Sequence, residues 1–115
     1  MTTFTVPGQP IPKGRPRFVK GRVYTPQKTA IYEAKVAKWA KVAGVKKIEE
    51  GDVSIALDVY YKNKSHGDLD NVVKSVMDGL NKVAWDDDKQ VCHIDAWRNY
   101  DKGNPRVEVD IYITP

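Results

Sequence analysis

Two spacings of apolar residues define the best-marked elements of the chain. From residue 53 onward, apolar residues alternate with others, which predicts a half-buried strand. Its apolar side consists of Val53, Ile55, Leu57 and Val59. Residues 69–80 instead place apolar residues three and four apart, which predicts an amphipathic helix with its polar side chains on the opposite face.

Proline, glycine and turn residues predict the remaining elements. The opening FTVPG indicates a short strand, and the following QPIPKGRPRFVKGRVYTP indicates an extended or looped segment rather than a helix. A first helix is expected to begin after Thr25-Pro26 and to end at Gly44. Its apolar side is expected to hold Ile31, Tyr32, Trp39, Val42 and Ala43. Residues 90–114 predict two strands joined by DKGNP as a hairpin.

These elements predict an α+β fold with the order β-α-β-α-β-β. One mixed sheet with both helices packed on it buries all of the apolar faces. The chain of 115 residues shows no repeat and no linker, so residues 1–115 are expected to form a single domain.

Composition narrows the class of protein. The apolar and charged fractions, 41% and 30%, are typical of an ordinary globular chain. No apolar run approaches the roughly 18–20 residues that span a bilayer, and MTTFTVPGQP lacks the features of a signal peptide. The single Cys92 cannot form an internal disulfide, and two histidines do not provide zinc-ligand spacing. A cytoplasmic protein with no membrane partner is therefore expected, and its small core favours a dimer.

Charge is distributed unevenly along the chain. Between residues 13 and 47 the charged residues are basic except for Glu33, whereas the acids concentrate after Glu49. Such a basic half is either a solvated face or a phosphate-binding surface, where Lys and Arg release counterions from a polyanion. Composition alone does not choose between the two.

The segment HGDLDNVVKSVMDGLNKVAWDDDKQV gathers six aspartates in a chain of net charge +4. Asp68 precedes the first helical turn, where a carboxylate caps free N–H groups at the positive end of the dipole. Asp70, Lys74 and Asp78 are spaced four apart on the polar face, and surface ion pairs are their ordinary interpretation.

The triplet Asp86, Asp87 and Asp88 is harder to explain structurally. Three consecutive acids before a strand offer no evident cap or helix pair, and their repulsion predicts a positive partner. Carboxylates from a helix start and a strand start are typical ligands of Mg²⁺. Such a site polarises a phosphoryl oxygen and supplies an attacking water.

Other acid chemistries fit the segment less well. An EF-hand requires a glycine that DLDNVV lacks. A D-x-D phosphatase would place its acids after a buried strand, whereas YKNKSHG is polar. A carboxylate pair for glycoside hydrolysis fits the residue types but gives the basic half no role.

The two acidic motifs together resemble a known family. GDLDNVVKSVMDGLN followed by AWDDDKQV is similar to the core of the RusA-type Holliday junction resolvases, often carried by prophages. PKGRPRF, GRVYTP and YE are similar to the phage branch of that family. The resemblance extends from Pro7 to the final strand, and the combination of the two motifs makes it specific.

The resemblance implies a homodimeric, Mg²⁺-dependent endonuclease that nicks two opposed strands of four-way junction DNA in recombination and repair, without a small-molecule cofactor. It matches the paired acids of the family with Asp68 and Asp70, the lysine with Lys74 and the third acid with Asp88. Because three aspartates are consecutive here, Asp87 shares or takes the third role, and Asp86 is the least expected of the three.

Physical reasoning assigns further roles beside the resemblance. Lys74, one turn beyond Asp70, can place an ammonium near the scissile phosphate. The N-terminal loop is expected to hold flanking phosphates without reading sequence, with Phe18 anchoring it to the core. The DNA-binding residues expected there are Lys13, Arg15, Arg17, Lys20 and Arg22. Trp85 and Trp97 are either core or dimer contacts.

The sequence thus predicts a structure-selective DNA endonuclease. Two alternatives stay open at this point. One is a non-catalytic nucleic-acid-binding module whose acids are merely solvated, and the other is a small-molecule phosphohydrolase, which would have little use for the basic half.

Overall fold

The computed structural model describes residues 2–15, 17–24 and 26–115, with the backbone alone at Arg17 and Tyr24. In chain order its elements are β1 (Thr2–Pro7), β2 (Arg17–Val19), β3 (Arg22–Tyr24), α1 (Gln27–Val42), β4 (Val53–Tyr61), α2 (Leu69–Leu80), the 3₁₀ helix η1 (Asp88–Gln90), β5 (Val91–Tyr100) and β6 (Arg106–Ile113). No helix in this described part of the chain is long and apolar enough to cross a membrane.

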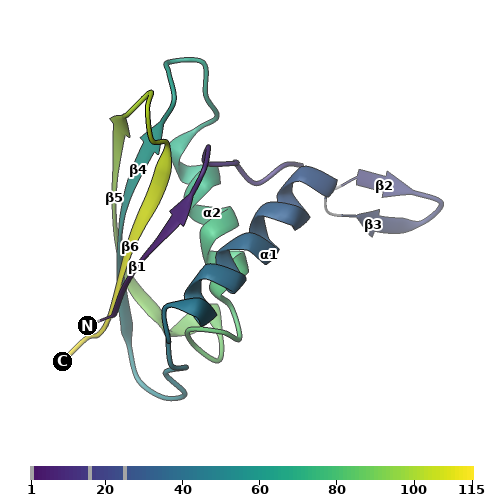
Figure 1. Ribbon diagram of the computed structural model, residues 1–115. Coiled ribbons are helices and arrows are strands. Elements are labelled where there is room, and N and C mark those ends of the chain that lie inside the picture. The colour runs from purple at the N-terminus through teal and green to yellow at the C-terminus, as the bar shows by residue number, and fades with distance from the viewer. Residues whose placement is uncertain (1, 16, 25) are drawn as a thin grey trace.

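A four-stranded mixed sheet forms one layer, and both helices cover the same face of it (Figure 1). The strand order is β1-β6-β4-β5, with β4 antiparallel to β6 and parallel to β5. The predicted α+β fold with two helices on a mixed sheet is therefore confirmed.

The predicted hairpin of the last two strands is wrong, because β4 lies between β5 and β6. β4 is the most deeply buried strand, and its central position gives hydrogen-bond partners to both of its edges. The connection 101–105 passes over the end of β4, where the N–H of Asp101 donates to the carbonyl oxygen of Tyr61 at 2.9 Å. Five residues easily span two strand spacings of ~5 Å each.

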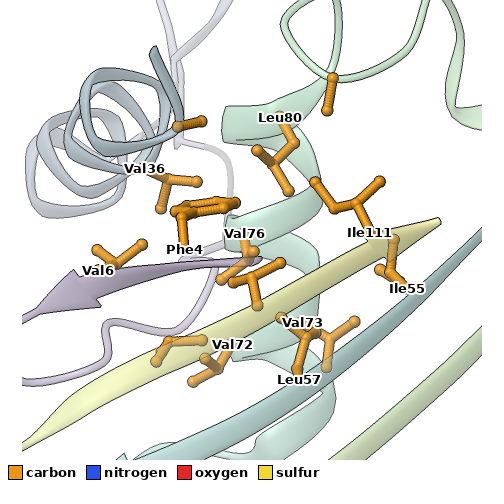
Figure 2. Close-up of a cluster of buried hydrophobic side chains, with 14 of the residues drawn as sticks. Phe4, Val6, Val36, Ile55, Leu57, Val72, Val73, Val76, Leu80 and Ile111 are labelled. Atoms are coloured by element: carbon orange, nitrogen blue, oxygen red, sulfur yellow. The ribbon is translucent and has the colours of Figure 1, made fainter. Parts of the chain in front are cut away.

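The core lies between the helices and the sheet. Figure 2 shows side chains from α1 and α2 meeting side chains from β1, β4 and β6 in one buried apolar cluster. α2 spans the residues that the apolar spacing predicts, and its predicted apolar side faces this core. Leu69 and Met77 are only partly buried, on the side that faces β5.

The predicted apolar side of α1 is partly wrong. The residues that α1 buries are Thr29, Tyr32, Val36 and Ala40. These follow the three-and-four spacing of a helical stripe, which leaves Ile31 and Val42 61% and 66% exposed. The helix ends as predicted, with Gly44 at a φ of +79° just beyond it.

The two helices approach each other closely at Gly79 of α2. A Cβ at this position would lie 2.7 Å from the carbonyl oxygen of Glu33 and 2.8 Å from the Cβ of Val36. The crossing fixes where α2 lies, and so where its first turn presents its acids.

The segment predicted to be extended or looped contains the two-stranded hairpin β2–β3. Its turn places Lys20 and Gly21 at φ values of +50° and +77°, as a tight primed turn requires. Figure 1 shows this hairpin projecting from the body beyond the start of α1. Phe18 is 73% exposed, so the prediction that it anchors the segment to the core is wrong.

Candidate active site

The first turn of α2 presents two carboxylates. Asp68 is the N-cap residue in extended conformation, but its side chain accepts no capping hydrogen bond from the helix. Asp70 lies in the first turn, and its Oδ1 accepts a hydrogen bond from the adjacent N–H of Asn71 at 3.0 Å. The backbone N–H groups at the positive end of the helix dipole lie next to both groups. Their oxygens therefore remain largely available to a cation.

Aromatic residues hold the approach to this turn. The ring of His66 stacks on Tyr61 with centroids 3.9 Å apart, and its Nε2 is 2.9 Å from the hydroxyl of Tyr100. The Tyr61 hydroxyl donates to the carbonyl oxygen of Gly67 at 3.2 Å, and burial raises the pKa of Tyr61, which keeps it a donor. A Cβ on Gly67 would lie 2.5 Å from Pro12, so glycine is required there. Stacking and hydrogen bonds thus hold the residues that lead into the two acids.

A groove of about 410 Å³ runs beside the polar face of α2. It is lined by Lys13, Gly14, Arg15, Asn71, Lys74 and Asp78. The fold thereby brings the N-terminal basic loop against the helix that carries the acids. Lys74 and Arg15 form no ion pair within the described residues, so both cations are available to an anion in the groove.

Lys13 has a different role from its neighbours in the groove. Its ammonium is 2.9 Å from Asp78 and 3.1 Å from Glu33, and its N–H donates to the carbonyl oxygen of Asn71 at 2.7 Å. Partial burial lowers the pKa of Lys13, but the hydrogen bonds to Asp78 and Glu33 outweigh it, so the pKa lies above its ordinary value. Lys13 therefore ties the loop to both helices. The ordinary interpretation of Asp70, Lys74 and Asp78 as surface ion pairs is wrong, because Asp78 pairs with Lys13 and Lys74 forms no ion pair among the described residues.

Each member of the aspartate triplet has a partner within the fold. Asp86 lies 3.4 Å from the ammonium of Lys47. Asp87 caps η1, accepting from the N–H of Lys89 at 2.9 Å while the Gln90 side chain accepts from the N–H of Asp87. Asp88 accepts a hydrogen bond from the Nε1 of Trp85 at 2.7 Å. The inference that the triplet lacks structural partners is therefore wrong.

The triplet and the first turn of α2 lie at opposite ends of the molecule's helical layer. Asp88 precedes Val91 at the start of β5, whereas the start of α2 contacts Tyr100 at its end through His66. α2 has 12 residues and is therefore ~18 Å long, and the distance between the triplet and the first turn of α2 is of this order. In the parts of the chain that the structure covers, no three His, Cys, Asp or Glu side chains gather as metal ligands. Within one chain, Asp68 and Asp70 thus both lie at the start of α2, and Asp87 and Asp88 lie far from them.

The other predicted cations divide between two places. Arg15 lines the groove, while Lys20 and Arg22 belong to the projecting hairpin. The side chain of Arg17 lies outside the described residues. Arg98 was not predicted, yet it shares a hollow with Asp68. The remaining lining of that hollow is His66, Leu69, Ala96 and Trp97. The alternation along β5, which places 94, 96 and 98 on the helix side, would have identified Arg98.

The opposite face of the sheet has the reverse charge. Alternation along the strands places four acids and one cation, Arg106, on this face. The acids are Asp58, Asp95, Glu108 and Asp110. Arg106 is already paired with Glu108 at 2.8 Å and with Asp101 at 2.9 Å. A polyanion is therefore attracted to the helical side and repelled from the open sheet.

Trp85 and Trp97 have separate environments. Trp85 is completely buried, as the core interpretation predicts. Trp97 lies on the outer strand β5 and is 65% exposed, so it is not core.

Comparison with known proteins gives two matches. Residues 7–112 match the family model described as Endodeoxyribonuclease RusA. The chain is also 33% identical to the Uncharacterized protein YqaN of Bacillus subtilis (strain 168), over 94% of this chain and 93% of that relative. The match to the family model covers both acidic motifs, the basic loop, β4, β5 and all of β6 except Ile113, but of β1 it includes Pro7 alone.

Proposed function

We propose that this chain, which belongs to the RusA family of endodeoxyribonucleases, resolves four-way DNA junctions by paired, Mg²⁺-dependent nicks in the cytoplasm of a bacterial or phage-infected cell. One observation carries the proposal beyond the family. The first turn of α2 presents Asp68 and Asp70, and Lys74, one turn further along, lines both the groove that contains Arg15 and the groove that contains Asp70. Acids with available oxygens beside phosphate-binding cations suit hydrolysis of a phosphodiester.

The donor set fits Mg²⁺. This ion prefers oxygen ligands and is usually held by one or two carboxylates together with waters and substrate phosphate oxygens. Asp68 and Asp70 supply two carboxylates whose oxygens are not consumed by capping or by ion pairs among the described side chains. When bound, Mg²⁺ polarises the phosphoryl oxygen and makes a water more acidic.

The groove residues position the substrate. Lys74, one turn along α2 from Asp70, brings its ammonium toward the phosphate that approaches the acids and stabilises the charge that develops on it. Arg15 holds a flanking phosphate at the loop side of the groove, and Arg98 does so beside Asp68. These contacts are to the backbone of the DNA and do not read its sequence.

A homodimer supplies the third acid. The outer strand β5 has a free edge in the described sheet, and an apolar groove of about 550 Å³ separates it from α2. The groove is lined by Leu69, Asp70, Val73, Lys74, Met77, Ile94 and Ala96. A two-fold axis at this edge reverses the partner's β5, which carries the partner's Asp87 and Asp88 toward the start of α2. The two separated acidic motifs then form two equivalent sites between the chains.

Two sites related by a two-fold axis match the symmetry of a four-way junction. Resolution requires two opposed nicks within one complex, and each interchain site provides one of them. The dimer therefore gives the free edge of β5 a partner. It also explains why the two acidic motifs of one chain lie far apart, because each site takes one motif from each chain.

The decisive test uses a synthetic four-way junction and a linear duplex of the same sequence. Wild-type protein is expected to nick the junction symmetrically with Mg²⁺ and to leave it intact with a chelator. Asp70→Asn is expected to bind the junction as well as the wild type or more tightly, because a charge that repels phosphate is lost, and to cleave at least ~100-fold more slowly. Near-normal cleavage by Asp70→Asn would exclude the first turn of α2 as the active site.

The same experiment separates the alternatives. A non-catalytic binding module would retain the junction without cutting it at any Mg²⁺ concentration. A small-molecule phosphohydrolase would hydrolyse a phosphomonoester, and junction DNA would not compete with that activity.

A further inference from the structure

The hairpin β2–β3 exposes three large apolar side chains to solvent. Phe18 and Val23 are directly opposed across the two strands and are 73% and 66% exposed, and Val19 next to the turn is 49% exposed. Figure 1 shows the hairpin standing away from the sheet and both helices. An isolated two-stranded ribbon is marginally stable, and a contiguous exposed apolar patch is a common feature of binding surfaces.

The charges around this surface indicate what binds it. The segment from residue 14 to residue 32 contains no acid, and cations flank the apolar pair in the sequence. These cations are Arg15, Arg17, Lys20, Arg22 and Lys28. An apolar patch inside a cationic segment matches a ligand with flat apolar faces and a polyanionic backbone, which is the chemistry of nucleic acid.

The root of the hairpin is fixed to the phosphate groove. The N–H of Gly14 donates to the Oγ1 of Thr29 at 2.9 Å, and Gly14 and Arg15 line the groove that contains Lys74. Three residues of strand reach ~10 Å beyond this root. DNA held in the groove by its backbone therefore meets the hairpin within a few nucleotides.

We propose that the hairpin is a wedge that recognises the branch point of DNA, with Phe18 stacking on a base at the interrupted step. The inference rests on the proposed function and adds the element that selects branched DNA. In continuous duplex, insertion of an aromatic ring has to break base stacking. At a branch point the stacking is weaker than in continuous duplex, so the same ring separates the two bases of the step and gains a base face at lower cost.

The test measures base unstacking without cleavage. A junction and a linear duplex carry the fluorescent base 2-aminopurine at the branch-point step and at the matching step, and the protein carries Asp70→Asn so that the DNA stays intact. Binding is expected to raise the fluorescence of the junction. Adding Phe18→Ala is expected to abolish this rise and to weaken junction binding ~10- to 100-fold, with less than ~3-fold change for the duplex.

Two further variants control the result. Phe18→Trp keeps a flat ring and is expected to retain the junction affinity. Ile31→Ala removes another exposed apolar side chain, from α1, and is expected to change neither the junction affinity nor the fluorescence rise. Because Phe18 is largely exposed, its replacement is expected to leave the thermal unfolding temperature unchanged.

Three outcomes would overturn the wedge. These are an unchanged fluorescence rise with Phe18→Ala, an equal loss of affinity for junction and duplex, and a shift of the monomer–dimer equilibrium by Phe18→Ala without DNA. The last would assign the hairpin to a second copy of the chain. Failure of the proposed function is distinguishable, since it appears as absence of Mg²⁺-dependent cleavage by wild-type protein, whereas the fluorescence and affinity measurements need no cleavage.

Discussion

At the residue scale, two lysines of one groove have opposite electrostatic surroundings. Lys13 lies between two carboxylates at 2.9 and 3.1 Å, whereas Lys74 has no acidic partner in the described structure within ion-pair distance. A cation already neutralised by the fold contributes to stability, and one left free contributes to binding an anion. Position in the sequence does not reveal this difference, because the partners of Lys13 are distant in the chain.

The two lysines therefore predict separable effects. Lys74→Ala is expected to slow junction cleavage ~10²- to 10³-fold, because it removes a charge from the phosphate site, with no change in the free energy of unfolding. Lys13→Ala is expected to lower that free energy by about 1–2 kcal/mol, since two carboxylates lose their partner. Thermal unfolding and single-turnover cleavage of both variants check this, with Lys102→Ala in the 101–105 connection as a control. Equal loss of stability in both variants would contradict the assignment.

Asp88 combines a structural and a proposed catalytic role, and two substitutions separate them. Asp88→Asn keeps an oxygen that accepts the Trp85 N–H, so its stability is expected to match the wild type while cleavage is lost. Asp88→Ala is expected to cost a further ~1–3 kcal/mol in the free energy of unfolding, because the Nε1 donor of Trp85 loses its acceptor. Urea unfolding compared with cleavage rates measures both. Cleavage by Asp88→Asn at the wild-type rate would show that Asp88 has only a structural role.

In the aspartate triplet, the sequence predicts the structural role of Asp87 but not that of Asp88. The spacing of Asp87 and Gln90 is that of a capping box, so the local role of Asp87 was predictable. The bond from Trp85 to Asp88 was not, because it depends on how the buried indole is oriented by the core. Asp68 was correctly placed at the helix start, while its lack of a capping bond needed the structure.

At the element scale, local patterns predicted α2 and β4 well, and failed where strands pair over long distances. The DKGNP turn indicated a hairpin, but turn residues do not determine whether another strand enters between the two they join. β2–β3 was missed because its three-residue strands are too short for alternation to be recognised. α1 was placed correctly along the chain, yet the face that it buries is set by its crossing with α2 at Gly79.

The crossing predicts an unusual response to a helix-favouring substitution. Alanine is normally ~1 kcal/mol more favourable than glycine inside a helix. At Gly79 the added methyl meets the carbonyl oxygen of Glu33 and the Cβ of Val36, so Gly79→Ala is expected to destabilise the protein by about 1–3 kcal/mol. Ala30→Gly, at an exposed position of α1, gives the ordinary propensity effect for comparison. Stabilisation by Gly79→Ala, measured by urea unfolding, would contradict the close approach.

At the scale of the whole molecule, the arrangement of charge and of the free strand edge predicts how two chains share their sites. Among the described side chains, unpaired cations lie on the helical side and four acids of the sheet on the other, so both chains of a dimer are expected to present their helical sides to one junction. The strand order could not be predicted from the sequence. Nor could the separation of the two acidic motifs, which the sequence suggested would meet within one chain.

Shared sites predict complementation between two inactive chains. In a mixed dimer of Asp70→Asn and Asp88→Asn, one interchain site has both substitutions and the other has none, so nicking of one strand is expected to return. Co-expression with two different tags isolates this mixed dimer, and sedimentation verifies that two chains are present.

A matched control uses Asp70→Asn with Asp68→Asn. Both substitutions then fall on the first turn of α2, each site contains one of them, and no nicking is expected. Failure of the Asp70→Asn and Asp88→Asn pair to cut would mean that each active site is built within one chain.

The strand order also has a consequence for how the chain is synthesised. β1 pairs, among the described strands, with β6 alone, in a register that joins Thr2 to Ile111. β1 is therefore made early and remains without its partner until β6 has left the ribosome. Because β6 also completes β4, the central strand keeps an open edge until β6 has been made. Native pairing of β1 therefore waits for a strand that follows it by about a hundred residues, and long-range pairing of this kind makes folding slow.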